Sequence, residues 1–286
     1  MNSLTEVIHQ LLDGSRSTSP SLIPVSGGCI HQAGRFEFLG KKYFIKWNRN
    51  ATDMFAAEAK GLNTLAATRT IAIPTVFQLG ELEDVDYLCM EYVESGVADY
   101  DFWQSFGQRL ADLHQCTADN FGLDHDNYIG SLSQSNKKHK HWNDFFILER
   151  LTPQIKRAFD QNLLSKRTAD KFDQLFLRLK DLIPKESPSL IHGDLWSGNF
   201  LIGKDQRAFI FDPAVYYGHR EAELAFSQMF GGFGKQFYRA YQDTFPLQPG
   251  HESRTDIFNL YPLLVHANLF GSSYLSAIER TLTHFT

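Results

Sequence analysis

The sequence predicts an α+β protein of two unequal lobes: a small β-rich lobe with an antiparallel sheet over residues 1–93, and a larger, mainly helical lobe over residues 94–286. Up to residue 93, short apolar runs are separated by turn residues, as in strands. Beyond it, apolar residues recur mostly at helical spacing. The polar stretch VESGVADYD (93–101) lies between the two patterns and is expected to join the lobes.

Four strands are expected in the first lobe. The run FEFLGKKYFIKWN (36–48) predicts a hairpin that turns at Gly40-Lys41, because glycine favours tight turns. The run TVFQLGELEDVDYLCMEYV (75–93) predicts two further strands.

Helices are expected in both lobes. In the first, DMFAAEAKGLNTLAAT (53–68) has apolar residues at helical spacing, and Asp53 is placed to cap it. A short amphipathic helix is also expected near the start of the chain, over residues 3–14. In the second lobe, apolar periodicity predicts helices around 102–113, 172–182 and 256–285.

Composition limits the classes of function. The chain has 286 residues, of which 43% are hydrophobic and 21% charged, as in ordinary globular proteins. The net charge of −5 argues against nucleic acid as the main partner, since phosphate binding needs a basic face. With three cysteines, no signal-peptide pattern and no apolar stretch near ~18 residues, we expect a cytoplasmic protein without a membrane partner, a monomer or weak homodimer.

The segment LIHGDLWSGNFLI (190–202) places polar residues between apolar runs. Asp194 precedes Asn199 by five residues, and Asp212 follows the β-type run AFIF (208–211). A carboxylate can take the proton of an attacking hydroxyl, and further oxygen ligands can hold Mg²⁺ on a nucleoside triphosphate. Protein kinases use this order of residues, with Asp-Phe-Gly where this chain has Asp212-Pro213-Ala214. The alternative for the loop alone is an Asx-rich turn between strands.

The first lobe supplies residues of the type that bind nucleotide phosphates. Lys46 ends a predicted strand, and Glu58 lies in the helix that follows, as in the kinase lysine–glutamate pair. Gly27 and Gly28 would let backbone N–H groups approach a phosphate. Taken singly, these residues also fit a surface lysine, a surface glutamate and a plain turn.

The segment MEYV (90–93) lies at the expected lobe junction. In kinases the connecting strand presents backbone groups to adenine, so Met90 is the gatekeeper here and Glu91 and Val93 are the adenine contacts. An ordinary core strand is the alternative. The order of all these features along the chain nevertheless indicates a two-lobed, protein-kinase-like fold.

On these residues the sequence resembles the fructosamine (ketosamine) kinases, relatives of the aminoglycoside phosphotransferases. The resemblance extends over nearly the whole chain, and Trp196 distinguishes this family within the catalytic loop. The matching stretches are GGCI (27–30), YFIKWN (43–48), MFAAEAKGLNTL (54–65), IAIPTVFQLG (71–80), FGLDHDNYIGSLSQSN (121–136), WNDFFILERLTPQI (142–155), LIHGDLWSGNFLI (190–202), FDPAVYYGHREAELAFSQMFGGF (211–233) and HANLFGSSYL (266–275).

The resemblance implies ATP- and Mg²⁺-dependent phosphorylation of a sugar hydroxyl on a small-molecule or protein-bound ketosamine, a step in deglycation repair. It implies Asp194 as catalytic base, Asn199 and Asp212 as Mg²⁺ ligands, and Lys46, braced by Glu58, as a phosphate ligand. It also implies that Gly27 and Gly28 cover the phosphates. The residues implied in the ketosamine pocket are Trp196, His219 and Glu223. For His219 and Glu223, a buried hydrogen-bond network that braces the following helix is the alternative.

Cys29 is expected within the phosphate loop itself, next to Gly28. Neighbouring backbone amides and cations lower the pKa of a thiol and so raise its reactivity. One hypothesis is that oxidation of Cys29 switches activity off; the alternative is a small residue that the loop tolerates.

Two other functions fit parts of the sequence. An aminoglycoside- or choline-type phosphotransferase would use the same cleft chemistry, although the second lobe is not conspicuously acidic, as polycation binding would require. A nucleotide-binding scaffold without turnover would more naturally lack Lys46, Asp194, Asn199 or Asp212, and all four are present.

Overall fold

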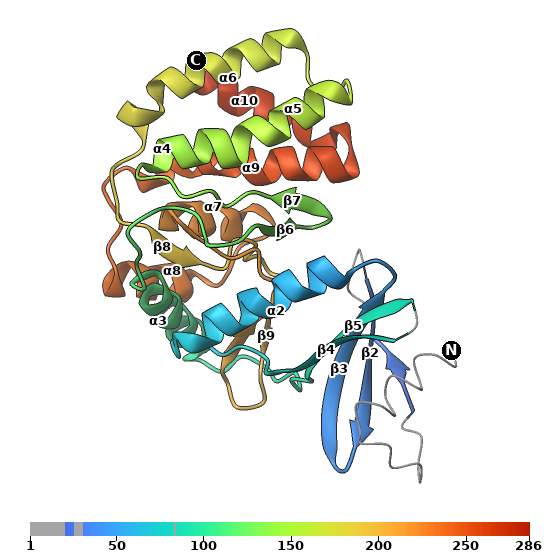
Figure 1. The fold of residues 1–286 in the computed structure, drawn as a ribbon. Helices are drawn as coiled ribbons and strands as arrows, with labels where there is room; N and C mark the ends of the chain where they lie inside the picture. Colours follow the sequence, from blue (N-terminus) through green and yellow to red (C-terminus); the bar gives the residue numbers. More distant parts are fainter. Residues whose placement is uncertain (1–20, 26–30, 83) are drawn as a thin grey trace.

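The computed structural model describes residues 21–25, 31–82 and 84–286, which form a small sheet lobe beside a larger helical lobe (Figure 1). The helix expected over residues 3–14 lies outside the described residues. The α+β, protein-kinase-like class expected from the sequence is confirmed. No helix in the described ranges is long and apolar enough to cross a membrane.

The small lobe is a five-stranded antiparallel sheet in the order β1-β2-β3-β5-β4. Helix α2 packs across one face of this sheet, as Figure 1 shows. The elements are β1 (Ile23–Pro24), β2 (Gln32–Phe38), β3 (Lys41–Asn48), α2 (Thr52–Ala67), β4 (Val76–Leu82) and β5 (Val85–Glu91).

The β2–β3 hairpin turns one residue earlier than predicted. Its two loop residues are Leu39 and Gly40, with φ of 49° and 73°, and Lys41 already belongs to β3. Two consecutive residues with positive φ are typical of the tight turns whose twist matches that of the strands. Gly40 therefore takes the second position of the turn.

Helix α2 buries Phe55 and Leu62 completely against Leu88 on the sheet. The prediction that Asp53 caps this helix is wrong, because the N-cap is Ala51 and makes no side-chain cap bond. Instead, Asp86 of β5 accepts hydrogen bonds from the Ala51 amide, at 2.7 Å, and from the hydroxyl of the first helical residue. A buried carboxylate from the sheet thus caps the helix.

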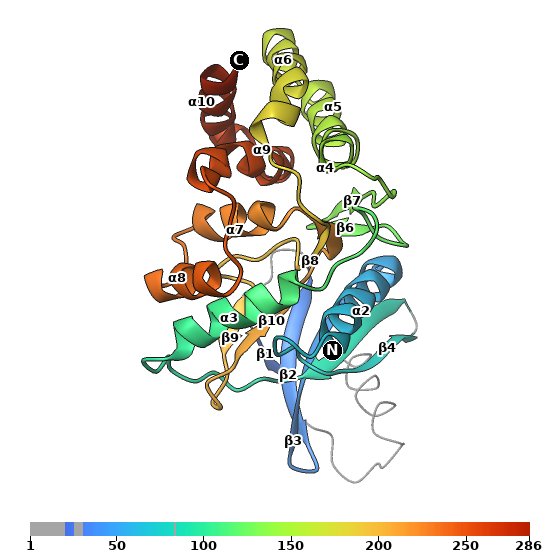
Figure 2. The same ribbon diagram turned by 90° about the vertical axis from the view of Figure 1, so that its left-hand side faces the viewer.

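The larger lobe consists mainly of helices, with three short strand pairs at its cleft side (Figures 1 and 2). The antiparallel pairs are β6 with β7, β8 with β11, and β9 with β10. Their bounds are β6 (Asn127–Ile129), β7 (Leu132–Gln134), β8 (Ser189–Ile191), β9 (Phe200–Ile202), β10 (Ala208–Ile210) and β11 (Tyr216–Gly218). The helices are α3 (Phe102–His114), α4 (Trp142–Phe145), the π-helix η1 (Phe146–Leu151), α5 (Thr152–Asp160), α6 (Lys166–Leu182), α7 (Arg220–Met229), α8 (Lys235–Thr244), α9 (His251–Phe270), the 3₁₀ turn η2 (Ser272–Tyr274) and α10 (Leu275–Phe285).

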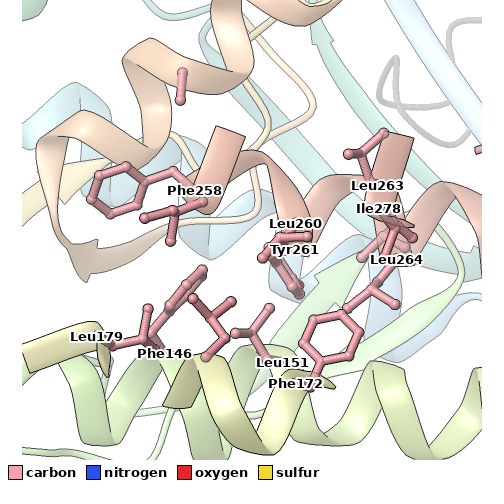
Figure 3. Packing of buried hydrophobic residues seen from close by; sticks show 14 of the residues in the cluster. Phe146, Leu151, Phe172, Leu179, Phe258, Leu260, Tyr261, Leu263, Leu264 and Ile278 are labelled. Carbon is pink, nitrogen blue, oxygen red and sulfur yellow. The ribbon is translucent and has the colours of Figure 1, made fainter. Parts of the chain in front are cut away.

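Helix α9 lies at the centre of the main core of this lobe. Its residues Phe258 and Leu264 are buried against Phe146 of η1, Phe172 of α6 and Ile278 of α10 (Figure 3). A helix that buries residues on most of its sides needs neighbours around it, and α5, α7 and α10 supply them. This packing gives the cleft a rigid floor.

The linker after β5 is attached to both lobes. On the helical-lobe side, Gly96 N–H donates to Ile202 O at 2.7 Å, and Lys204 N–H donates to Glu94 O at 3.1 Å. The Glu94 carboxylate also pairs with Lys204, at 2.9 Å, and with Lys42 of β3 in the sheet lobe. The linker thus joins the helical lobe by backbone bonds and an ion pair, and the sheet lobe by the Lys42 ion pair and a backbone bond from Tyr92 N–H to Lys42 O at 3.4 Å.

Candidate active site

A cavity of about 570 Å³ lies between the sheet lobe and the helical lobe. It brings together most of the residues predicted from the sequence, since the following line it: Lys46, Glu58, Met90, Glu91, Val93, Asp194, Trp196, Asn199, Asp212 and Glu223. His219 does not line it. Gly27, Gly28 and Cys29 lie outside the described residues.

Lys46 is shared between two carboxylates, one from each lobe. Its ammonium lies 2.9 Å from Glu58 Oε1, and it also pairs with Asp212 Oδ1. Strand β3 and helix α2 position the lysine and the glutamate, whereas Asp212 follows β10. Burial lowers the pKa of Lys46, but the two carboxylates raise it more, so the ammonium stays protonated.

The carboxylate of Glu58 is protonated more easily than an ordinary glutamate. Burial raises the pKa of Glu58 to about 7; Lys46 opposes this shift, and the Asp212 carboxylate adds to it. The pKa of Asp212 is lowered, because the attraction of Lys46 outweighs the effect of burial there. One ammonium between two carboxylates therefore leaves Glu58 near its titration point at neutral pH.

The catalytic loop turns sharply between β8 and β9. Gly193 has a φ of 83°, and a Cβ at this position would lie 2.1 Å from Ala214 O, so only glycine fits. The next residue, Asp194, faces the cleft, and Asn199 Nδ2 donates to both its backbone oxygen and its Oδ2, each at 2.8 Å. The asparagine thus fixes the orientation of the carboxylate.

Burial raises the pKa of Asp194 well above its usual range, and the neighbouring carboxylates of Asp212 and Glu223 add to this shift. The hydrogen bond from Asn199 acts in the opposite direction. A carboxylate with a raised pKa is a stronger base once ionised, and a bound cation would favour the ionised form.

His192 ties the catalytic loop to the segment that carries Asp212. Its Nε2–H donates to Phe211 O at 2.9 Å, and its Nδ1 accepts from the Asp194 amide at 3.3 Å. The Ala214 amide donates back to His192 O at 2.9 Å. Because burial lowers the pKa of His192, the ring is neutral and supports the loop in this tautomer.

Asp212 itself has a φ of 56°, a left-handed conformation that is uncommon for a residue other than glycine. Such a conformation persists only where surrounding contacts enforce it, and it often occurs at functional sites. Here it follows the strand β10 and directs the side chain into the cleft, where it meets Lys46.

Glu223 lines the cleft, but its carboxylate already has partners. It accepts from the His192 amide at 3.2 Å and from the Gly193 amide at 2.7 Å. Its Oε1 also lies 2.9 Å from Nε2 of His114, whose Nδ1 lies 2.8 Å from the hydroxyl of Tyr241. This geometry is the bracing network considered above as the alternative to acceptor binding.

His219 is fully buried at the N-terminus of α7. Its Nδ1 accepts from the Glu221 amide at 3.3 Å, and its Nε2–H donates to Pro184 O at 3.2 Å. These contacts cap the helix and again match the bracing alternative. Trp196, by contrast, lines the cleft. Its ring packs edge-on against Phe230, with 5.6 Å between the two ring centroids.

The ligand set suits Mg²⁺ bound to phosphates. With Nδ2 of Asn199 donating to Asp194, its carbonyl oxygen remains as a ligand atom, and Asp212 adds a carboxylate. Oxygen ligands of this kind are the ones Mg²⁺ prefers, and phosphates and water usually complete its shell. No cluster of three or more His, Cys, Asp and Glu able to hold a metal occurs in the described ranges.

Sequence reasoning missed several residues around this cleft. His31 lines the cleft from the sheet lobe, where Asn48 Nδ2 contacts its Nδ1 at 3.2 Å. The residues Asn127–Gly130 line the cleft from the β6–β7 hairpin. The segment FGLDHDNYIGSLSQSN had been noticed for its resemblance, but its pattern gave no role to single residues.

A Lys–Glu pair, a connecting strand, a base loop and a second acidic residue around one cleft between two lobes define a protein-kinase-like phosphotransferase. Solved structures agree on the fold: an aminoglycoside phosphotransferase superposes with a TM-score of 0.66 at 16% identity, covering 100% of this chain and 99% of the other.

The chain belongs to the fructosamine kinase family, whose model matches residues 1–286. It is 40% identical over 267 residues to "Probable ketoamine kinase" of Enterococcus faecium, covering 92% of this chain and 95% of that protein. It is 36% identical to the chloroplastic protein-ribulosamine 3-kinase of Arabidopsis thaliana, covering 93% and 83%. A solved structure from Thermobifida fusca, named after fructosamine-3-kinase, is 30% identical with a TM-score of 0.86, covering 99% and 98%.

Proposed function

We propose that this protein transfers the γ-phosphate of ATP to a sugar hydroxyl of a ketosamine, either a ribulosamine or a fructosamine adduct. The observation that carries the proposal is the placement of Asp194 in the cleft, held by Asn199 and next to Asp212. Family membership and the names of the relatives support a ketosamine as acceptor.

In the proposed mechanism Asp194 orients the acceptor hydroxyl and accepts its proton. Its side chain is anchored by the amide of Asn199, so little rearrangement is needed when the acceptor arrives. Positioned bases of this kind typically contribute 10²–10⁴-fold to a rate. Asn199 therefore has two roles: one side of its amide fixes the base, and its oxygen is available to the metal.

Mg²⁺, held by Asn199 and Asp212, would neutralise charge on the phosphates and align them with the acceptor. Lys46 binds the phosphates, and Glu58 keeps its ammonium in place. Since Lys46 now pairs with Asp212 as well, nucleotide binding exchanges that ion pair for contacts to phosphate and metal. Gly27 and Gly28 cover the triphosphate, and Glu91 and Val93 contact adenine beside Met90.

At the acceptor end, Trp196 contacts the ketosamine. We assign Glu223 and His219 to supporting contacts instead, because their polar atoms already have protein partners. An aminoglycoside- or choline-type acceptor remains the second candidate. The aminoglycoside enzyme is only a distant relative in fold, at 16% identity.

Phosphorylation at the sugar makes a ketosamine labile and frees the amine, so the proposed role is deglycation repair inside the cytoplasm. The acceptor is a small-molecule or protein-bound ketosamine. We expect the protein to act as a monomer or weak homodimer, with neither nucleic acid nor membrane as partner.

The test is ATP- and Mg²⁺-dependent phosphate transfer, read out by mass spectrometry. The acceptors are a ribulosamine, a fructosamine, a kanamycin-type aminoglycoside and choline, each with wild-type and Asp194→Asn protein. We expect phosphate on a ketosamine and a loss of about 10³-fold in rate with Asp194→Asn. Transfer to the aminoglycoside or choline alone would overturn the acceptor but keep the mechanism; transfer to no acceptor would overturn both.

A further inference from the structure

Three buried amide side chains connect the β6–β7 hairpin to the segment after Asp212. They are Asn127, Gln134 and Asn136, exposed by 5%, 2% and 1% respectively. We call them, with Arg150, the amide network. In both views of the fold the hairpin lies between α2 and the helix α5 of the larger lobe (Figures 1 and 2).

The network ends on two backbone carbonyls that follow Asp212. Asn127 Nδ2 donates to Val215 O at 2.8 Å, and Gln134 Nε2 donates to Ala214 O at 3.2 Å. These carbonyls stand two and three residues beyond Asp212. In the described part of the chain, they are bonded by side chains more than 75 residues away in sequence.

Arg150 and the two backbone carbonyls together fix the direction of the bonds in the network. An arginine only donates, so Asn136 must present its oxygen to Arg150 Nη2, at 2.6 Å. Asn136 Nδ2 then donates to Asn127 Oδ1 at 3.1 Å, and Gln134 Nε2 donates to the same oxygen at 2.7 Å. With its oxygen used in this way, Asn127 can only donate to Val215 O.

A buried cation is costly unless its surroundings compensate it. Arg150 is fully buried in the π-helix η1, and its guanidinium lies 4.0 Å from the ring centre of Tyr216 and 4.4 Å from that of Phe145. It also donates to Ser135 O at 2.6 Å. π-helical turns often occur at functional sites, and this one places Arg150 beside the hairpin.

The backbone on both sides of Asp212 is thus held. His192 bonds Phe211 O before it and accepts from the Ala214 amide after it, and the amide network adds bonds to Ala214 O and Val215 O. Between them Asp212 takes its left-handed φ of 56°. A strained residue keeps such a conformation only while its neighbours enforce it.

We propose that Asn127, Gln134 and Asn136 are positioning residues for Asp212, with Arg150 orienting Asn136. They hold the backbone so that the carboxylate faces the metal site. The inference rests on the proposed function, because it takes Asp212 as a Mg²⁺ ligand. Without the network, the segment relaxes and the metal loses a ligand, while metal-free nucleotide binding is unaffected.

The test is calorimetric titration of the full-length protein with ADP, once with saturating Mg²⁺ and once with EDTA. Asn127→Ala and Gln134→Ala are compared with wild type. We expect the affinity gained on adding Mg²⁺ to fall at least tenfold for Asn127→Ala and less for Gln134→Ala. The affinity in EDTA should stay within twofold of wild type.

Asn268→Ala is the matched control. Asn268 is also an amide that bonds within the helical lobe, with Nδ2 donating to Gln154 O at 3.0 Å. Its loss should lower the melting temperature as the network variants do, yet leave the Mg²⁺-dependent gain intact. An equal loss of this gain in the control would show a general effect of instability and overturn the proposal.

If Asn127→Ala does not fold, Arg150→Met keeps the test open, because it removes the fixed donor without touching the carbonyls after Asp212. We expect a loss of the Mg²⁺-dependent gain here too. Variants that keep the full wild-type gain would overturn the inference alone. A wild-type protein that binds ADP no better with Mg²⁺ would instead overturn the metal role in the proposed function.

Discussion

The two sides of the cleft hold their charged groups in different ways. On the nucleotide side, the charged ends of Lys46, Glu58 and Asp212 have one another as ion-pair partners, and the Lys46–Asp212 pair joins the two lobes. On the loop side, Asp194 and Glu223 are held by amide N–H donors of the same lobe. Ion pairs can exchange when a charged ligand arrives, whereas hydrogen bonds to a packed backbone hold their geometry. One side adapts to the nucleotide and the other keeps the base in place.

The largest effect on activity is expected when the Lys46 ammonium, which both carboxylates share, is removed. Lys46→Met leaves Glu58 and Asp212 as neighbouring carboxylates without the ammonium between them. We expect kcat/KM for ATP to fall by about 10²–10³-fold, the size typical of a lost electrostatic contact in the transition state. Steady-state kinetics with varied ATP would measure it.

Lys42→Met is the control for this change, since Lys42 lies on the same strand but pairs with Glu94 at the linker. Its kcat/KM should change by less than about threefold, as expected for an exposed ion pair. Similar losses in both variants would argue against a specific role of Lys46.

Glu223→Gln tests the fixed side. Glutamine replaces one accepting oxygen of Glu223 with an NH2 group, which donates. This group would face either the Gly193 amide, or the His192 amide together with Nε2 of His114, and all of these are donors. We expect the free energy of unfolding to fall by about 2 kcal/mol and kcat by about tenfold, with KM for ATP nearly unchanged. Chemical denaturation and kinetics on the folded fraction give both values.

Tyr241→Phe removes only the hydroxyl that contacts His114, at the far end of the same network. It should cost about 1 kcal/mol of stability and leave kcat almost unaltered. If kcat of Glu223→Gln also stayed at the wild-type level, Glu223 would not hold the loop as described.

Glu58→Gln sharpens the comparison through pH. In the folded protein the pKa of Glu58 is about 7, above the usual 4.5. Between pH 4.5 and 7 the folded state therefore binds more protons at this carboxylate than the unfolded state does. Stability from this group is therefore full below pH 4.5 and is lost as pH rises toward 7. Glu58→Gln should remove this decline, on the order of 3 kcal/mol, in denaturation curves taken across that range.

Glu94→Gln has the opposite sign and serves as the comparison. Hydrogen bonds from Lys42 and Lys204 lower the pKa of Glu94 to about 2, so its contribution is present above pH 4.5 and lost as pH falls toward 2. A Glu58→Gln protein whose pH profile matched wild type between 4.5 and 7 would contradict the shared-ammonium description.

The smallest effect is expected from the cysteines. Burial raises the pKa of Cys89 to about 12 and also raises that of Cys116, which makes both poor nucleophiles. Sensitivity to peroxide should therefore depend on Cys29. We expect Cys29→Ala to slow inactivation several-fold relative to its own untreated activity, and Cys116→Ala to change nothing. Unchanged sensitivity of Cys29→Ala would end the redox hypothesis.

The sequence predicted the lobes and the residues that meet in the cleft, because each carries its own chemical signal. Lys46 follows the apolar run Tyr43-Phe44-Ile45, although β3 continues to Asn48, and Asp194 and Asn199 lie between the apolar runs of 190–191 and 200–202. The sequence pattern therefore marks all three. The fixed spacing within the loop then relates the proposed base to the proposed metal ligand. These signals are local, and local patterns survive in the fold.

What the sequence could not predict depends on distant partners. Asp86 caps α2 in place of Asp53, from 34 residues beyond the helix start. Asn127 bonds a backbone carbonyl 88 residues away, and every residue has such a carbonyl. Glu223 looks like any cleft carboxylate until the backbone amides that it accepts from are located. Only the packed structure selects among these partners.

The linker attachment has a consequence for how ionic strength acts on the protein. The Gly96–Ile202 and Lys204–Glu94 backbone bonds belong to the larger lobe, whereas Lys42 reaches Glu94 across half-exposed surface. Added salt screens the second kind of contact far more than the first. Salt should therefore weaken the Lys42–Glu94 contact and leave the backbone bonds of the linker, so ionic strength sets how firmly Glu94 ties the sheet lobe to the linker.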